Sequence, residues 1–205
     1  MTDAGRQGAE ARCVEGGSRV AREAHTGGPE SAGVAATNAG AAALVVVCGL
    51  PGVGKSTVAK RIAEHVDGEV LRTDVIRKEL FPDPTYADSE TEAVYAELLS
   101  RARTLAADGD SVVLDATFAD RRFRGAVTEA AASVADRFEL VKVECDEAVV
   151  RRRIERRDGV SDADFDVYLQ FKRSFEPLDR DHVVIDNSGA RETTHEQVDT
   201  ALFID

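Results

Sequence analysis

A glycine-rich turn between an apolar run and an amphipathic run constrains the fold of this chain more than any other feature. Residues 44–57 read LVVVCGLPGVGKST. The apolar run has the length of a buried strand, the turn has the spacing G-x-x-x-x-G-K-S, and residues 55–65 follow with helical periodicity. A turn without a ligand is the alternative. A strand, a loop, a Lys-Ser pair and a helix in this order predict a phosphate-binding P-loop.

The residue types of this loop suit a nucleoside triphosphate. Glycines adopt backbone angles that other residues rarely adopt, so successive N–H groups can turn inward around phosphate oxygens. Lys55 would place a positive charge at the β- and γ-phosphates, and Ser56 would bind Mg²⁺. The following helix directs the positive end of its dipole at the same anion. We therefore expect ATP and Mg²⁺ as cofactors, with ATP held by Gly49, Gly52, Val53, Gly54, Lys55, Ser56 and Thr57.

The composition is acidic and poor in lysine. The net charge is -12, and five of the 26 basic residues are lysines. Such a surface keeps a protein soluble in concentrated salt and suggests a halophilic source, although an ordinary acidic cytosolic protein is the alternative. A nonspecific nucleic-acid binder needs a basic face, so the charge argues against that class.

The cysteines and the hydropathy pattern indicate a cytoplasmic protein. Cys13, Cys48 and Cys145 are odd in number and scattered, which predicts free thiols in a reducing compartment. No apolar run has the length of a membrane span, and the N-terminus lacks the apolar core of a signal peptide.

The chain divides into a compositionally biased segment and one expected domain. Residues 1–40 are rich in Gly, Ala and Glu without helical or strand periodicity, so we expect a disordered extension, or a translated upstream segment. In residues 41–205 strands alternate with helices, which predicts an α/β fold of the three-layer P-loop NTPase type with a five-stranded parallel sheet. The first expected strand ends at residue 48, and the other four span 69–72, 111–114, 138–144 and 183–186. The expected helices span 55–65, 74–80, 89–107, 121–134, 147–157, 193–202 and a stretch opening at residue 161, and a Ser89–Glu92 capping box opens the third.

Acidic residues follow three of these strands, at Asp74, Asp115 and Asp186. Open parallel sheets bind ligands beyond the carboxyl ends of their strands, so this pattern is informative. Asp74 and Arg77 lie one helical turn apart. The aspartate would accept the proton of a hydroxyl that attacks the γ-phosphate, while the arginine holds the acceptor. A helix-capping carboxylate in a solvated ion pair is the alternative.

Asp115 closes a Walker B-like strand, Val-Val-Leu-Asp, and is expected to bind Mg²⁺ directly or through water. A simple turn aspartate is the alternative. The next residues, Ala116-Thr117-Phe118, include no glutamate that would activate water. This argues against a motor ATPase and favours a transferase.

An arginine-dense helix precedes Gly159 and predicts a lid over the triphosphate. Such a lid neutralises charge that develops during transfer and excludes water. Surface arginines facing an acidic body are the alternative. Arg153 and Arg157 are the expected inward pair among Arg151, Arg152, Arg153, Arg156 and Arg157.

These motifs together resemble a known family. The P-loop, the segments RTDVIR (72–77), VLDATF (113–118) and VIDNSG (184–189), and the arginine-rich lid are similar to the small P-loop kinases often labelled AAA-family ATPases. That group includes phage-type polynucleotide 5′-kinase, gluconate kinase and zeta-toxin-like kinases. The resemblance covers residues 44–205.

The resemblance implies a role for each matching position. Asp74 would be the general base, Arg77 an acceptor contact, Asp115 an active-site or magnesium-binding acid, and Arg153 or Arg157 the lid arginine. Residues 187–189, with Asn187 and Ser188, would flank the adenine. Polynucleotide kinases usually have Asp-Thr-Asn where this chain has Asp115-Ala-Thr117, which argues against a nucleic-acid acceptor.

We therefore expect an ATP-dependent kinase whose partners are ATP and a hydroxyl-bearing acceptor. The acceptor is a small molecule or, as the less favoured choice, a nucleic-acid 5′ end. Two alternatives remain at this point: an ATP-binding regulatory ATPase without an acceptor, and a toxin-type kinase.

Overall fold

The described part of the chain contains a single five-stranded sheet in which all strands are parallel. The computed structural model describes residues 42–156 and 162–203, and these belong to one compact unit. The expected extension 1–40, Arg157 and the helix start at residue 161 lie outside the described residues. The strands follow the order β2-β3-β1-β4-β5. Their bounds are β1 (Ala43–Cys48), β2 (Glu69–Arg72), β3 (Val112–Asp115), β4 (Arg137–Glu144) and β5 (Val183–Asp186).

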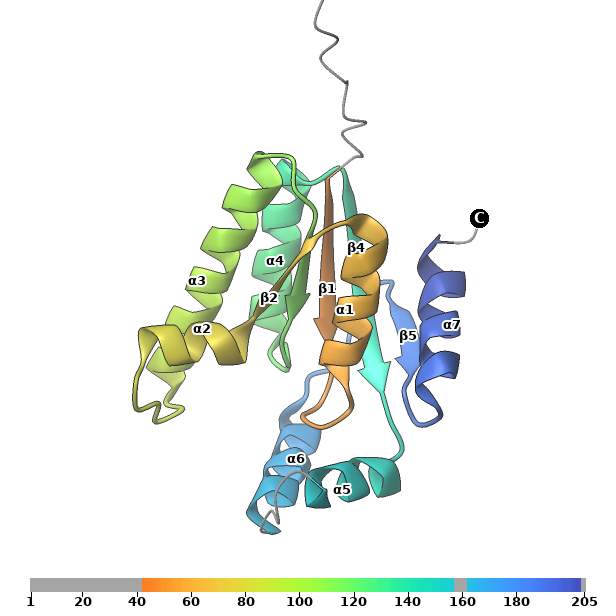
Figure 1. Cartoon of the computed structure of the whole chain (residues 1–205). Coiled ribbons are helices and arrows are strands. Elements are labelled where there is room, and N and C mark those ends of the chain that lie inside the picture. Colours follow the sequence, from red (N-terminus) through yellow and green to blue (C-terminus); the bar gives the residue numbers. More distant parts are fainter. Residues whose placement is uncertain (1–41, 157–161, 204–205) are drawn as a thin grey trace, which may run out of the picture. The chain divides into compact units, whose positions relative to one another are not determined.

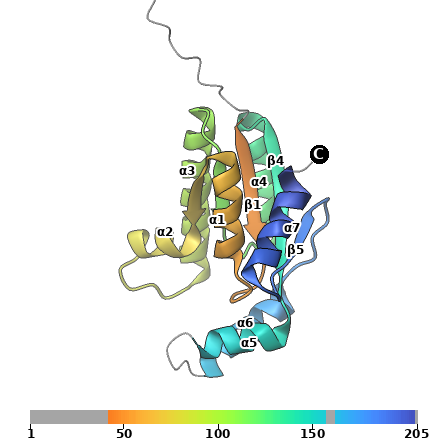
Figure 2. The same ribbon diagram turned by 45° about the vertical axis from the view of Figure 1, so that its right-hand side comes forward.

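Helices cover both faces of this sheet and confirm the expected α/β class (Figures 1 and 2). β1 alternates between the faces, since Val45 and Val47 pack with α1 and α7, whereas Leu44 and Val46 pack with α3 and α4. The helices are α1 (Lys55–Val66), α2 (Thr73–Leu80), α3 (Asp88–Ala107), α4 (Arg121–Val134), α5 (Glu147–Glu155), α6 (Asp162–Ser174) and α7 (Arg191–Phe203).

All five strands end at the same edge, which we call the carboxyl edge. The P-loop, α2, α5 and α6 lie there, at the lower end of the sheet in Figure 1. The pairing of β2 with β3 sets Arg72 beside Asp115 at this edge. The register therefore brings together two charged residues that are distant in sequence.

The start of α3 differs from the expected Ser89–Glu92 capping box. The helix begins at Asp88, and Ala87 precedes it without a side-chain cap. The Glu90 carboxylate instead reaches back and accepts hydrogen bonds from the backbone N–H groups of Thr85 and Tyr86. A carboxylate in the first turn thus satisfies donors of the preceding loop, which the Ser-x-x-Glu pattern does not reveal.

The two cysteines in the described residues are free thiols. Cys48 is fully buried in β1, and burial raises the pKa of its thiol to about 11. None of the described helices has the combination of length and apolar character needed to cross a membrane.

An acidic side chain joins α7 to α1. Asp199 accepts hydrogen bonds from Arg61 Nε and Nη2 at 2.8 and 2.6 Å, and its Oδ1 lies 2.7 Å from His65 Nε2. The hydrogen bonds from Arg61 lower the pKa of Asp199 from 3.8 to about 2.

We expect Asp199→Asn to lower the melting temperature near neutral pH. A lowered pKa in the folded state stabilises the fold above the ordinary pKa of 3.8, and this contribution is lost as the pH falls through about 2. The melting-temperature difference between parent and variant should therefore disappear between those pH values. Glu196→Gln, an exposed change on the same helix, is the control. A difference that is unchanged down to pH 2 would contradict this account.

Candidate active site

Three elements hold the backbone of the P-loop (residues 49–56) in place. At its start, Gly49 N–H donates to the Thr117 carbonyl at 3.2 Å. Near its end, the Val53 carbonyl accepts from Asn187 Nδ2 at 2.7 Å and from Arg153 Nη1 at 3.3 Å. The β3–α4 loop, the residue that follows β5, and α5 therefore hold the two ends of the P-loop backbone.

The Lys-Ser pair of the P-loop begins α1. Lys55 Nζ donates to the Leu50 carbonyl at 3.0 Å, so the side chain curls back across the loop. Ser56 Oγ donates to Asp115 Oδ2 at 2.6 Å. Asp115 ends β3 and is buried. A hydroxyl oxygen next to a carboxylate oxygen is a donor set that suits Mg²⁺.

Asp74 lies in the first turn of α2, just beyond β2. Its Oδ2 accepts from Arg72 Nη2 at 2.8 Å, and its Oδ1 accepts from the Val75 N–H at 3.0 Å. Arg72 Nε also lies 3.5 Å from Asp115 Oδ2. A continuous series of polar contacts therefore leads from Ser56 through Asp115 and Arg72 to Asp74.

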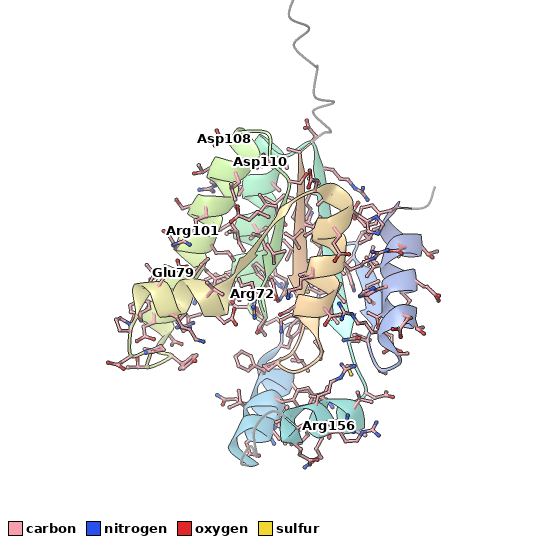
Figure 3. The ribbon with its side chains drawn as sticks, viewed as in Figure 1. Arg72, Glu79, Arg101, Asp108, Asp110 and Arg156 are labelled. Carbon is pink, nitrogen blue, oxygen red and sulfur yellow. The ribbon has the colours of Figure 1, made fainter. Side chains whose placement is uncertain are left out.

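Sequence reasoning did not identify Arg72 as a site residue. Figure 3 shows Arg72 at the carboxyl edge, while Asp108 and Asp110 lie at the opposite end of the sheet. The available signal is the position of Arg72 as the last residue of β2, which a parallel register sets beside the last residue of β3.

Arg77 has different neighbours from those expected of an acceptor contact. Its guanidinium is buried and donates to Thr91 Oγ1 at 3.1 Å and to Glu90 Oε2 at 3.4 Å. The same group lies 4.9 Å from the centre of the Tyr86 ring. Arg77 thus joins α2 to the start of α3, and its role toward an acceptor stays a prediction.

The arginines of α5 point in different directions. Arg153 faces the P-loop, where Nη2 also donates to the Asn187 carbonyl at 2.9 Å. Arg151 lies over the Phe165 ring of α6, with 3.7 Å between guanidinium and ring centre. Arg156 is exposed beyond the helix (Figure 3). Arg153 is therefore the arginine among these three that touches the phosphate loop, and Arg157 lies outside the described residues.

Asn187 and Ser188 follow β5 and support neighbouring loops. Asn187 is buried, and its Oδ1 accepts from Thr194 Oγ1 of α7 at 2.8 Å. Ser188 Oγ accepts from the Asp146 N–H at 2.8 Å, at the start of α5. Their expected position beside the adenine stays a prediction.

The Asn187–Thr194 contact leads to a stability prediction. Thr194→Val removes the hydroxyl but keeps the side-chain shape, so Asn187 Oδ1 loses its buried donor. We expect a decrease of about 1–3 kcal/mol in the free energy of unfolding, measured by urea denaturation. The exposed neighbour offers a matched control, Thr193→Val, which should change stability by less than about 0.5 kcal/mol. Equal effects of the two substitutions would contradict the proposed importance of this contact.

A second arginine that sequence reasoning missed, Arg124 of α4, connects two loops at the carboxyl edge. It is buried, and its guanidinium donates to the carbonyls of Phe118 and Ala119 and to those of Glu176 and Pro177, at 2.6 to 3.0 Å. These carbonyls belong to the β3–α4 loop and to the segment after α6. Arg124 thus fixes the end of α6 relative to β3.

A cavity of about 540 Å³ adjoins the P-loop. We call it the β4–α6 cavity, because its walls come from the P-loop residues Gly49, Leu50 and Val53, the end of β4, and α6 with the residues that follow it. Two lysines line it, and each forms an ion pair: Lys142 with Glu144 at 2.6 Å, and Lys172 with Glu147 at 2.8 Å. Apolar side chains, among them Leu50, Val143 and Phe175, also line the cavity, and four of its five charged lining residues form these two ion pairs.

Comparisons with known proteins agree with this geometry. Residues 44–178 match the AAA domain family AAA_33. An uncharacterized protein of Mycobacterium tuberculosis is 32% identical over 164 residues, which represent 73% of this chain and 32% of the relative. The chain thus spans about a third of the length of that relative.

Three solved structures that share this fold are kinases by name. A sugar kinase from Janibacter sp. HTCC2649 has a TM-score of 0.62 at 20% identity, over 80% of this chain and 95% of that one. A gluconokinase from Sinorhizobium meliloti 1021 has a TM-score of 0.60 at 22% identity, over 76% and 89%. The APS kinase CysC of Mycobacterium tuberculosis, in complex with AMPPNP and APS, has a TM-score of 0.61 at 17% identity, over 77% and 95%. This chain belongs to the AAA domain family and has the fold of the small P-loop kinases.

Proposed function

We propose that this protein is an ATP- and Mg²⁺-dependent phosphotransferase that moves the γ-phosphate of ATP to a hydroxyl group of a small molecule. The series of contacts from Ser56 through Asp115 and Arg72 to Asp74 carries this proposal, because it joins the phosphate loop to an exposed carboxylate at the same edge of the sheet. A transferase needs a carboxylate on the acceptor side to accept the proton of the attacking hydroxyl, whereas a nucleotide switch does not.

The proposed reaction is a direct displacement at the γ-phosphorus. The acceptor hydroxyl oxygen forms a bond to phosphorus, and the bond from phosphorus to the β,γ-bridging oxygen breaks to release ADP. Asp74 accepts the proton of the attacking hydroxyl. The P-loop N–H groups and Lys55 bind the phosphate oxygens and stabilise the charge that develops on them.

Ser56 and Asp115 would hold the metal ion. Bound there, Mg²⁺ would supply positive charge to the β- and γ-phosphate oxygens. Arg153 would hold the Val53 carbonyl away from the phosphates by hydrogen bonding, which leaves the neighbouring N–H groups to the anion. These roles divide the work between positioning and electrostatic stabilisation.

A small-molecule acceptor is favoured over a nucleic acid. The chain carries a net charge of -12, whereas binding to a phosphate backbone requires a basic face. Among the structural neighbours are a sugar kinase and a gluconokinase, which agree with a polyol or sugar acid as the acceptor.

The decisive test follows the label of [γ-³²P]ATP. The protein is incubated with Mg²⁺ and a panel of sugars, sugar acids, nucleosides and aminoglycosides, beside a 5′-hydroxyl oligonucleotide, in low and in high salt. Label on one small molecule, absent with Lys55→Ala, supports the proposal. Label on the oligonucleotide alone would overturn the acceptor class. Release of free phosphate that no acceptor changes would favour a regulatory ATPase instead.

A further inference from the structure

Arg72 lies between the two acids of the proposed site. Its side chain is 36% exposed, yet its Nε atom is buried and finds no hydrogen-bond partner among the described residues. That Nε lies 3.5 Å from Asp115 Oδ2, slightly beyond a good hydrogen bond, while Nη2 donates to Asp74 Oδ2 at 2.8 Å. One guanidinium thus faces both carboxylates with different atoms.

The sheet register and the start of α2 create this arrangement. Arg72 pairs with Asp115 across the β2–β3 ladder, so their side chains leave the sheet side by side. Asp74 follows two residues later, on the first turn of α2. The planar fork of arginine, with donors on several nitrogens, can engage two carboxylates at once, which the single ammonium group of lysine cannot do with the same geometry.

The same oxygen of Asp115 also receives the Ser56 hydroxyl at 2.6 Å. A cation bound by Ser56 and Asp115 would therefore lie within several ångströms of the Arg72 guanidinium. Two positive charges at such a distance repel each other, and both use Asp115 Oδ2. Arg72 and the metal ion thus compete for one carboxylate.

We propose that Arg72 is a positioning residue that assigns separate tasks to the two acids: it keeps the Asp74 carboxylate away from the metal ion, and it weakens metal binding at Asp115. This inference rests on the proposed Mg²⁺-dependent function. Asp115 is left as the acid that serves the metal, and Asp74 as the acid that receives the acceptor proton. The cost of this division is a lower affinity for Mg²⁺.

If Arg72 only supported the local structure, its replacement would weaken Mg²⁺ binding. The proposed role predicts that its replacement strengthens Mg²⁺ binding. In Arg72→Gln the competing charge is absent and Asp74 is free to turn toward the metal, so Mg²⁺ should bind more tightly. We expect the factor by which Mg²⁺ tightens AMP-PNP binding to rise about tenfold. Arg72→Lys keeps the positive charge but lacks the fork that holds Asp74, so its factor should lie between those of the parent and of Arg72→Gln.

The experiment measures AMP-PNP affinity by calorimetry with saturating Mg²⁺ and with EDTA, on the full chain. Arg101→Gln is the matched control, because Arg101 is 35% exposed and also pairs with two acids, Glu79 at 2.8 Å and Glu97 at 2.7 Å. Figure 3 shows the Arg101–Glu79 pair away from the carboxyl-edge position of Arg72. Melting curves verify that every variant is folded.

The outcomes separate the two proposals. A raised factor in Arg72→Gln, a smaller rise in Arg72→Lys and a parent-like factor in Arg101→Gln support the role of Arg72. If Mg²⁺ tightens AMP-PNP binding to the parent, but by the same or a larger factor than in folded Arg72→Gln, that role is overturned. The proposed function then stays intact. A parent protein that binds no AMP-PNP overturns both.

Discussion

Asp74→Asn is expected to leave ATP binding unchanged and to slow phosphoryl transfer by about 10²- to 10⁴-fold. The amide oxygen of asparagine can still accept the hydrogen bond from Arg72 Nη2, which spans 2.8 Å in the parent. The amide cannot accept the proton of an attacking hydroxyl at neutral pH. The substitution therefore removes the basic group and retains the local geometry.

The measurement compares the rate of transfer to the acceptor found by the label screen with the AMP-PNP affinity of the same variant. Asp108→Asn is the control, because Asp108 is an exposed aspartate that caps α3 at the opposite end of the sheet (Figure 3). Equal transfer rates for Asp74→Asn and the parent would remove Asp74 from the role of base. A loss of nucleotide affinity that matches the loss of rate would assign Asp74 to ATP binding instead.

Much of the fold could be predicted, because local signals agree with one another. The expected bounds of β2 and β5 and of α4 coincide with the observed ones. The end of α2 at Leu80 follows from the proline-containing segment that comes after it. The P-loop could be placed because its strand, glycines and helix are adjacent in sequence.

The contacts of the site could be predicted only in part, because they depend on register and side-chain direction. Ser56 and Asp115 are expected neighbours, since both belong to short motifs that meet at one edge. In the sequence Arg72 is an ordinary strand residue, and only the β2–β3 pairing shows that it lies beside Asp115. Arg77 shares a helical face with Asp74 in sequence, but the start of α3 supplies Glu90 and Thr91 as closer partners. These partners belong to the first turn of α3, and the sequence does not determine how the preceding loop places that turn against α2.

Gly54→Ala is expected to reduce phosphoryl transfer by about 100-fold or more and to lower the free energy of unfolding by about 2–4 kcal/mol. Gly54 has φ of 93°, in the region that favours glycine. A Cβ atom built there would lie 2.0 Å from Asn187 Nδ2. Asn187 cannot withdraw without cost, because its side chain is buried between the Val53 carbonyl and the Thr194 hydroxyl.

Two separate penalties therefore coincide at Gly54: a strained backbone and a steric collision with the residue that holds the P-loop. Either the loop shifts, which misplaces the phosphate-binding N–H groups, or Asn187 moves, which releases the Val53 carbonyl. Gly125→Ala provides a control of opposite sign, since Gly125 lies exposed within α4 and has no atom within 4 Å of the added Cβ. That substitution should stabilise the protein by about 0.5–1 kcal/mol without changing nucleotide affinity. Urea denaturation measures the free energy of unfolding, and calorimetric titration with AMP-PNP measures the nucleotide affinity. If Gly54→Ala has the stability and the affinity of the parent, the loop tolerates a side chain at its most crowded position.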